Sequence, residues 1–369
     1  MENERVTFLD RVIRGKWIGK LLLVFIGILA VWGVGSKAVQ NPQLFIQQVV
    51  NGLQLGFVYA LIALGYTMVY GIVRLINFAH GDVFMLGAFI SYYSVGRFQL
   101  HMWPSAVFPA ISPTISLLIG TITVILLSMV SCAILAMVIE RIAYKPLRNA
   151  PRISALITAI GVSFFLEYFG ALPFVFTPNF ITYKRPFEIV TWYVKDGIYR
   201  LEAGSAPPTG SVLFSNILII IVLASVFLML SLNYIVRRTK IGKAMRATAY
   251  DKPTSRLMGI NVDGIISTTF ALGASLAGAA GVLYATAYPQ VFFWMGIIPG
   301  LKAFVAAVLG GIGSIPGAFV GALIMGQAEV LSAGYISTPM RDAIAFTILI
   351  LVLLIRPTGI FGEPEREKA

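Results

Sequence analysis

A polar segment between two apolar runs carries the side chains best suited to chemistry within this chain. Asn77, His80 and Asp82 lie there, and Gly81 separates the last two. An ionisable group inside a bilayer is costly, so it is a functional hypothesis by default. In one interpretation a helix is broken here, and these four residues surround exposed backbone on a substrate pathway. In the other, the segment is an interfacial turn in which Asp82 caps the following helix. The residue types leave both interpretations open.

A glycine-rich run near the C-terminal end predicts a second break. Residues 310–317 contain four glycines and one proline, including Gly310, Gly311 and Gly313, with Ser314 among them. Such a run cannot form a stable uninterrupted helix. Non-helical backbone at membrane depth survives only where it is buried in protein or lines an aqueous cavity. We therefore expect a broken helix or a re-entrant turn, and these residues join the candidates for the substrate pathway.

The sequence contains no constellation that indicates an enzyme. The phosphate-binding motif GxxxxGK[ST] does not occur, because the Gly-Lys pairs at 15–16, 19–20 and 242–243 are followed by Trp, Leu and Ala. We expect no cofactor in this chain, so ATP and magnesium would be bound by partner subunits. No metal site is expected either, because there are two histidines and one cysteine, Cys132. Glu167 and Glu329 lie in apolar surroundings, where each is either a buried contact, which we favour, or a group on the pathway.

The elements that must position these residues are membrane-spanning helices. Of the 369 residues 58% are apolar and 12% are charged, whereas a soluble domain has about 45–50% and about 25%. The net charge of +12 is gathered in short segments between apolar runs. That distribution is typical of the positive-inside rule and argues against a nucleic-acid partner. The lipid bilayer is therefore the expected environment.

The predicted fold class is all-α, with about ten transmembrane helices. A retained first helix over 21–34 is favoured over a cleaved signal peptide, which Ser36-Lys37-Ala38 would also permit. The other expected spans are 45–73, 75–96, 108–139, 153–176, 213–236, 264–288, 298–312, 317–334 and 341–355.

Charged loops set the expected orientation. The basic loops 140–152 and 237–263, the N-terminus and the tail 357–369 are predicted to be cytoplasmic, and 177–211 periplasmic. We expect an N-terminal segment, 1–44, followed by a permease domain, 45–356. Five spans on each side of the outer loop would form an inverted repeat. The echo of Gly56-Phe-Val-Tyr59-Ala60 in Gly281-Val-Leu-Tyr284-Ala285 supports it.

The basic loop 237–263 is longer than a simple connection needs. It predicts a helix over 244–249 and a second helix capped by Asp251 and ended by Gly259 in a left-handed conformation. The loop is either a docking surface or an ordinary basic loop. The candidate docking residues are Gly242, Lys243, Ala244, Arg246, Asp251, Thr254, Ser255, Arg256, Leu257, Met258 and Gly259.

Three blocks, taken in order, resemble one family. Residues 71–81, together with 59–70 before them, resemble the early signature of branched-chain amino acid ABC permeases. Residues 242–261 resemble that family's ATPase-docking motif, and 301–318 its late glycine-rich signature. The resemblance covers about 45–356, whereas residues 1–44 depart from the shorter members.

The resemblance implies a permease subunit of an ATP-driven importer for branched-chain or other small apolar amino acids in the cell inner membrane. It implies four kinds of component: this chain, a second related permease, two ABC ATPase subunits and a periplasmic amino-acid-binding protein. It further implies that the helix near 254–258 inserts into an ATPase cleft. Transport of urea or short-chain amides, an ion-coupled secondary transporter and a membrane-embedded enzyme remain the alternatives.

Overall fold

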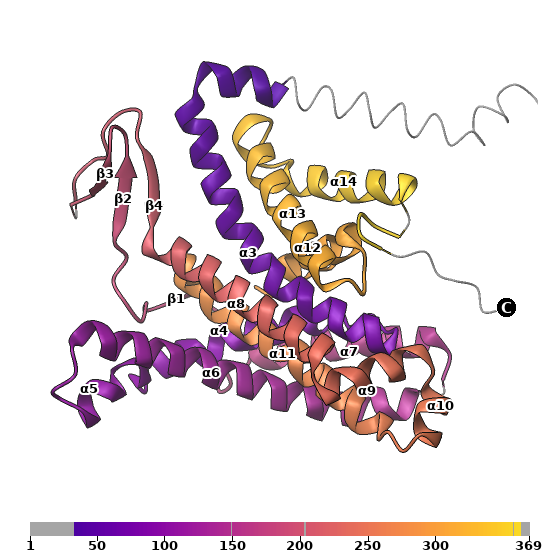
Figure 1. Cartoon of the computed structure of the whole chain (residues 1–369). Helices are drawn as coiled ribbons and strands as arrows, with labels where there is room; N and C mark the ends of the chain where they lie inside the picture. Colours follow the sequence, from indigo (N-terminus) through magenta and orange to yellow (C-terminus); the bar gives the residue numbers. More distant parts are fainter. Residues whose placement is uncertain (1–32, 149, 203, 357, 363–369) are drawn as a thin grey trace, which may run out of the picture.

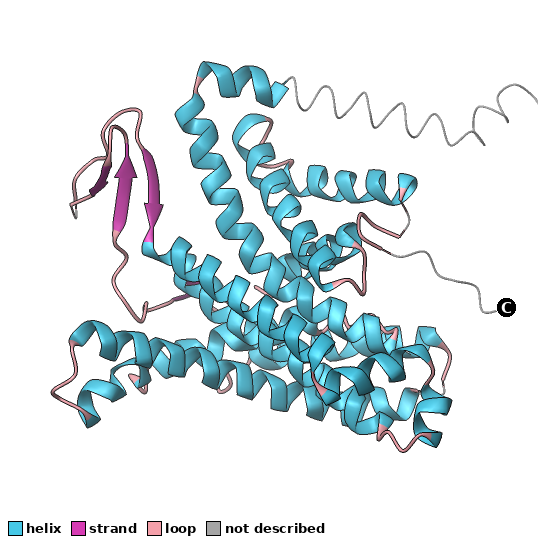
Figure 2. Cartoon of the chain, in the orientation of Figure 1, coloured by secondary structure: helices cyan, strands magenta, loops and turns pink. Residues whose placement is uncertain are grey.

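The computed structural model describes residues 33–148, 150–202, 204–356 and 358–362. Most of the expected first helix, 21–34, therefore lies outside the described residues, as does the end of the tail. Within them the chain is mainly helical, with two small antiparallel sheets (Figures 1 and 2). The helices are α3 (Pro42–Val73), α4 (His80–Gly96), η1 (Leu100–Met102), α5 (Trp103–Val107), α6 (Pro113–Ile139), η2, a π-helical turn (Glu140–Tyr144), η3 (Lys145–Leu147), α7 (Arg152–Gly170), α8 (Asn216–Arg238), α9 (Lys240–Tyr250), α10 (Lys252–Leu257), α11 (Val262–Ala287), α12 (Ile297–Gly310), α13 (Ile315–Tyr335) and α14 (Arg341–Ile355).

Each expected span inside the described residues coincides with one of these helices. Six segments are long and apolar enough to cross a membrane: those of α3, α6, α7, α8, α11 and α13. The other three expected spans are the shorter helices α4, α12 and α14, of 17, 14 and 15 residues. The chain is therefore a polytopic helical membrane protein.

The outer loop differs from the all-helical expectation because it contains strands. β2 (Thr191–Val194) pairs with both β3 (Ile198–Arg200) and β4 (Val212–Ser215). β1 (Ile181–Thr182) pairs with β5 (Gln290–Val291) and ties this loop to the end of α11. Thr191, Trp192 and Tyr193 favour strands, since β-branched and aromatic side chains pack well on a pleated surface.

Helix α3 lies at the centre of the bundle and contacts α11, α12 and α13 (Figure 1). Its start is fixed by Asn41, whose side chain accepts a hydrogen bond from the Leu44 amide at 3.1 Å, and by Pro42 in the first turn. Residues 58–64 of α3 are fully buried. By contrast, α6 and α8 expose apolar side chains such as Leu118 and Leu223. Such a ring of exposed apolar groups suits contact with lipid.

The two ends of the bundle carry different structures. The β2–β4 sheet lies at one end and α9 with α10 at the other (Figure 1). Hydrogen bonds join each of these structures to α3. The Gln47 side chain of α3 bonds to the backbone of Leu213 in β4, and the Lys252 side chain of α10 bonds to the Val73 carbonyl at the end of α3 at 3.3 Å. The loops expected on opposite sides of the membrane therefore lie at opposite ends of the molecule.

Candidate functional site

The loop between α8 and α11 folds into the two short helices that the sequence predicts. The Asp251 side chain accepts a hydrogen bond from the Thr254 amide at 3.1 Å and caps α10. Gly259 follows α10 with φ of +81°, a conformation that disfavours any residue with a Cβ. Both local predictions are confirmed.

The surface around α9 and α10 exposes three large apolar side chains among its basic residues. The side chains of Leu257 and Met258 are 88% and 78% exposed, and Tyr250 is 79% exposed. Large exposed apolar side chains that lie together make a candidate interaction surface. Gly242 and Ser255, in contrast, are buried within the chain. These two candidate docking residues therefore cannot contact a partner directly, since their helices pack them inward.

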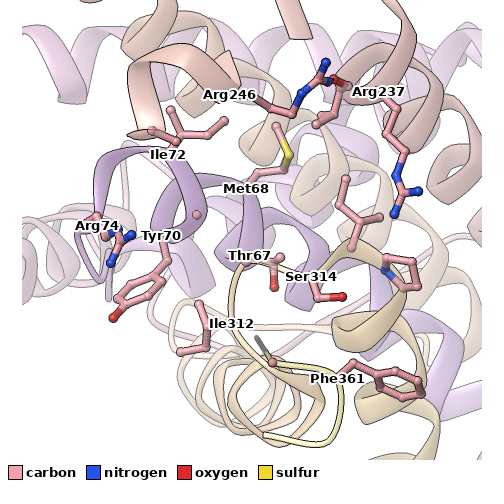
Figure 3. A pocket seen from close by; sticks show the side chains of 17 residues that line it. Thr67, Met68, Tyr70, Ile72, Arg74, Arg237, Arg246, Ile312, Ser314 and Phe361 are labelled. Atoms are coloured by element: carbon pink, nitrogen blue, oxygen red, sulfur yellow. The ribbon is translucent and has the colours of Figure 1, made fainter. Parts of the chain in front are cut away.

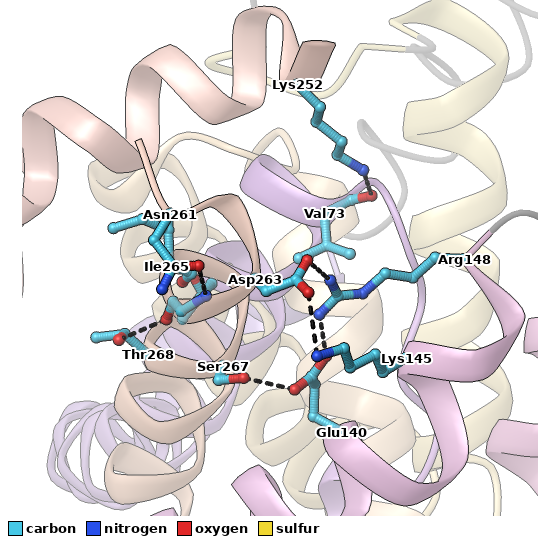
Figure 4. Close-up of polar contacts among 12 residues, drawn as sticks. Val73, Glu140, Lys145, Arg148, Lys252, Asn261, Asp263, Ile265, Ser267 and Thr268 are labelled. Carbon is cyan, nitrogen blue, oxygen red and sulfur yellow. Dashed lines mark hydrogen bonds and ion pairs between the residues drawn. The ribbon is translucent and has the colours of Figure 1, made fainter. Parts of the chain in front are cut away.

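Beneath α10 lies a network of charged side chains (Figure 4). Asp263, at the start of α11, accepts from Arg148 at 2.5 Å and pairs with Lys145 at 3.0 Å. Arg148 also bonds to the buried Glu140 in η2. Ser267 in α11 donates to the other oxygen of Glu140 at 2.6 Å. The network thus joins α11 to the end of α6.

Helix α10 is connected to this network. The Arg256 guanidinium lies 3.4 Å from Asp263, so this candidate docking residue also contacts α11. Burial and three neighbouring arginines lower the pKa of Lys252, whose ammonium group bonds to the end of α3. Displacing α10 would therefore pull on α3, α6 and α11 together.

A cavity of about 550 Å³ lies between α9 and the glycine-rich turn (Figure 3). Three arginines from separate elements line it: Arg74, Arg237 and Arg246. We call it the arginine cavity. Thr67 and Ser314 also line it, and the described segment 358–362 contributes Phe361 and Gly362 (Figure 3).

The glycine-rich run forms the turn between α12 and α13. Gly311 and Gly313 have φ of +104° and +100°, so no other residue fits there without strain. Ser314 caps α13 by accepting from the Gly317 amide at 3.2 Å. The close approach of Gly310 to Gly317 lets the two helices pack backbone to backbone. The predicted break is present, and the turn lines the arginine cavity.

The polar segment before α4 is also a break. Helix α3 ends at Val73 and α4 begins at His80, with Ala79 as an N-cap that has no side-chain hydrogen bond. Asp82 therefore does not cap this helix. His80 packs against Gly65, which lies eight residues, or roughly 12 Å along the helix axis, before the end of α3. Asn77, in the connecting segment, is buried and accepts from Tyr144 of η2 at 2.6 Å.

Asp82 instead lines a second cavity, of about 210 Å³, which we call the acidic cavity. The Ser163 hydroxyl of α7 donates to Asp82 Oδ2 at 2.5 Å, whereas Asp82 Oδ1 is buried without a hydrogen-bond partner among the described residues. Glu167, one turn further along α7, lines the same cavity beside Asp82. The remaining lining residues are Tyr66, Phe78, Gly81, Ile160, Phe164, Gly296, Ile297, Gly300 and Leu301.

Glu329 is a buried contact rather than a cavity residue. It accepts from Lys302 at 2.6 Å and from Tyr59 at 2.9 Å. Lys302 also lies 2.7 Å from Asp342 at the start of α14. These contacts join α3, α12, α13 and α14.

The sequence patterns do not single out several residues that carry these contacts. Lys302 lies in a block used for the family resemblance, and Arg148 lies in a basic loop, but neither position indicates its partner. Glu140 and Asp263 each lie at a span boundary beside basic residues, which is the one sequence signal for their pairing.

Comparison with known proteins gives a consistent result. The family model described as branched-chain amino acid transport system / permease component matches residues 48–353. The high-affinity branched-chain amino acid transport system permease protein LivH of Salmonella typhimurium is 41% identical over 333 residues, 88% of this chain and 97% of that protein. LivH of Escherichia coli K12 is 39% identical with the same coverage. BraD of Pseudomonas aeruginosa is 40% identical, covering 88% of this chain and 98% of its own. No solved structure matches the chain.

Proposed function

The chain belongs to the family of permease components of branched-chain amino acid transport systems, and we propose that it moves leucine, isoleucine or valine into the cytoplasm as one subunit of an ATP-driven importer. A second related permease would complete the membrane part. Two ABC ATPases would bind ATP and magnesium, and a periplasmic binding protein would deliver the amino acid.

The observation that carries this proposal is the exposed apolar surface of α10. Leu257 and Met258 project from a rigid, capped helix at the end of the bundle that bears the arginine cavity. Two adjacent exposed apolar side chains on a capped helix suit an interaction surface. A cleft on an ATPase subunit would bury them.

Coupling would run through the network under α10. Motion of an ATPase pushes α10, and the Arg256–Asp263 contact transmits it to α11. Arg148 carries it on to Glu140 and α6. Because charged contacts of this kind have discrete arrangements, the spans would move as bodies rather than deform.

Two features support an inverted repeat of ten spans over the permease domain, 45–356. In each half a long helix is followed by a non-helical stretch and a short helix: α3 with α4, and α11 with α12. The short helices meet at their N-terminal ends, where Gly81 contacts Gly296 and Gly300. Such a meeting of half-helices is what an inverted repeat produces at the membrane midplane.

The proposed orientation places α9, α10, 357–369 and the N-terminus in the cytoplasm and the β2–β4 sheet in the periplasm, within the inner membrane. The charges support it. Arg237, Arg238, Lys240 and Lys243 are concentrated at the α9 end, as the positive-inside rule requires.

Purification of the tagged chain from its native membrane under mild detergent tests the class of transporter. The proposal predicts that two ATPases and a second permease co-purify in fixed ratio, and that the preparation hydrolyses ATP. A homogeneous preparation of this chain alone that catalyses ion-coupled uptake would contradict it.

A further inference from the structure

The acidic cavity lies where the two short helices meet, since Gly81, Gly296 and Gly300 are among its lining residues. We propose that it is a binding site for the amino acid in transit, with the ammonium group held between Asp82 and Glu167. This inference rests on the proposed function and deepens it, because it assigns the residues that recognise the substrate within the membrane.

The carboxylates are the first reason. Asp82 is 1% exposed, and its Oδ1 has no hydrogen-bond partner among the described residues although it borders a cavity. Glu167 is 5% exposed and lies beside it. Two neighbouring carboxylates repel each other when both are ionised, so they attract a cation or share a proton. A primary ammonium group supplies three donors and one positive charge, which satisfies both.

The rest of the lining fits the rest of an apolar amino acid. Ile160 and Phe164, from the same helix as Glu167, and Leu301, from α12, supply the apolar part of the lining. The cavity is smaller than the roughly 300–1,000 Å³ of sites for drug-sized ligands, so it suits a molecule with few atoms. Gly296 and Ile297, at the N-terminal end of α12, lie at its edge. A helix dipole favours negative charge there, which suits the substrate carboxylate.

The cavity also indicates where the pathway runs. Ionisable side chains within membrane spans face the bundle interior or water, not lipid. Helix α7 nevertheless leaves Ile160 and Phe164 exposed beside the acidic pair, by 40% and 54%. A water-filled path shared with the second permease would solvate this exposed side of the cavity. The exposed side of α7 therefore faces that subunit in our proposal.

Charge-selective labelling tests the site in the complete importer. Cys132 is first replaced by alanine, and Ser163→Cys then places a thiol on the cavity wall. Two methanethiosulfonate reagents, one bearing an ammonium group and one a sulfonate group, are then compared by the rate at which each modifies this thiol. A cleft lined by one sign of charge concentrates the opposite ion about tenfold or more. We expect the ratio of the cationic rate to the anionic rate at this thiol to exceed the same ratio for free cysteine by about that factor. Excess leucine should slow the reaction with the cationic reagent.

Matched variants make the result specific. Asp82→Asn and Glu167→Gln should each remove most of the charge preference and the protection by leucine. Ser314→Cys in the arginine cavity should favour the anionic reagent instead, because three arginines line it. Ile160→Cys places a thiol on the same helix and leaves the Ser163–Asp82 hydrogen bond intact. It replaces Ser163→Cys if that variant does not assemble.

An unchanged labelling rate with excess leucine, in an importer that still transports leucine, would overturn the site and leave the proposed function intact. Equal rates for the two reagents at position 163 or 160 would overturn it as well, as would protection that survives Asp82→Asn. An importer that takes up no branched-chain amino acid would contradict the proposed function itself.

Discussion

The Lys302 ammonium group lies 2.6 Å from Oε1 of Glu329, and both side chains are almost completely buried between α12 and α13. A charge in such a place is stable only while it is paired. The pair therefore fixes the two helices that flank the glycine-rich turn.

Removing one partner should be more harmful than removing both. Lys302→Met removes the buried cation beside Glu329, leaves that carboxylate with the Tyr59 hydroxyl and the more distant Arg341, and should lower the free energy of unfolding by about 3–5 kcal/mol. The double variant Lys302→Met/Glu329→Gln should recover a large part of that loss. Folded yield and thermal unfolding in detergent measure both, and a double variant less stable than Lys302→Met would refute this account of the pair.

Glycine contacts between helices give a second prediction. A Cβ on Gly278 would lie 2.8 Å from the Ser128 carbonyl oxygen in α6, whereas a Cβ on Gly161 in α7 meets nothing within 4 Å. Gly278→Ala should therefore destabilise the bundle by about 1–3 kcal/mol through overpacking. Gly161→Ala is the matched control and should stabilise it by up to about 1 kcal/mol, because alanine favours helix. Equal thermal shifts for the two would argue against the packing.

Docking through α10 predicts a loss of assembly without a loss of folding. Leu257→Glu puts a charge into the proposed apolar contact, yet the exposed position should change stability by no more than about 0.5 kcal/mol. Co-purification of the ATPase subunits should fall steeply, while Leu257→Met retains it. Full ATPase recovery with Leu257→Glu would mean that α10 is not the docking element.

Orientation is tested by the reactivity of single cysteines, with Cys132 replaced by alanine. Ser205→Cys beside the β2–β4 sheet should react with an impermeant maleimide in cells whose outer membrane has been permeabilised. Met258→Cys should react only after the inner membrane is opened, in cells that lack the ATPase subunits. Ser255 is unsuitable because it is buried. The reverse pattern would invert the proposed topology.

The sequence predicts the spans and the two short helices α9 and α10 because their signals are local. Apolar runs define α3, α8 and α11 directly. Asp251 and Gly259 mark the two ends of α10 through capping and a left-handed turn, which depend on a few neighbouring residues.

The contacts between distant segments could not be predicted in the same way. Arg148 and Asp263 are 115 positions apart, and Lys302 and Glu329 are 27 apart. A single sequence gives the charge of each residue but not the helix faces that meet. Asp82 illustrates this, because the sequence left a helix cap and a broken-helix position both open, whereas the fold places its carboxylate against Ser163 of α7. The strands of the outer loop depend likewise on pairing with each other.

Transport of branched-chain amino acids with energy from partner ATPases is measured as uptake of labelled leucine by proteoliposomes that contain the purified complex, with binding protein outside and ATP inside. We expect ATP-dependent leucine uptake that excess isoleucine or valine inhibits by competition and that Leu257→Glu abolishes. Uptake of labelled urea that excess leucine does not affect, or leucine uptake that does not depend on ATP, would contradict it.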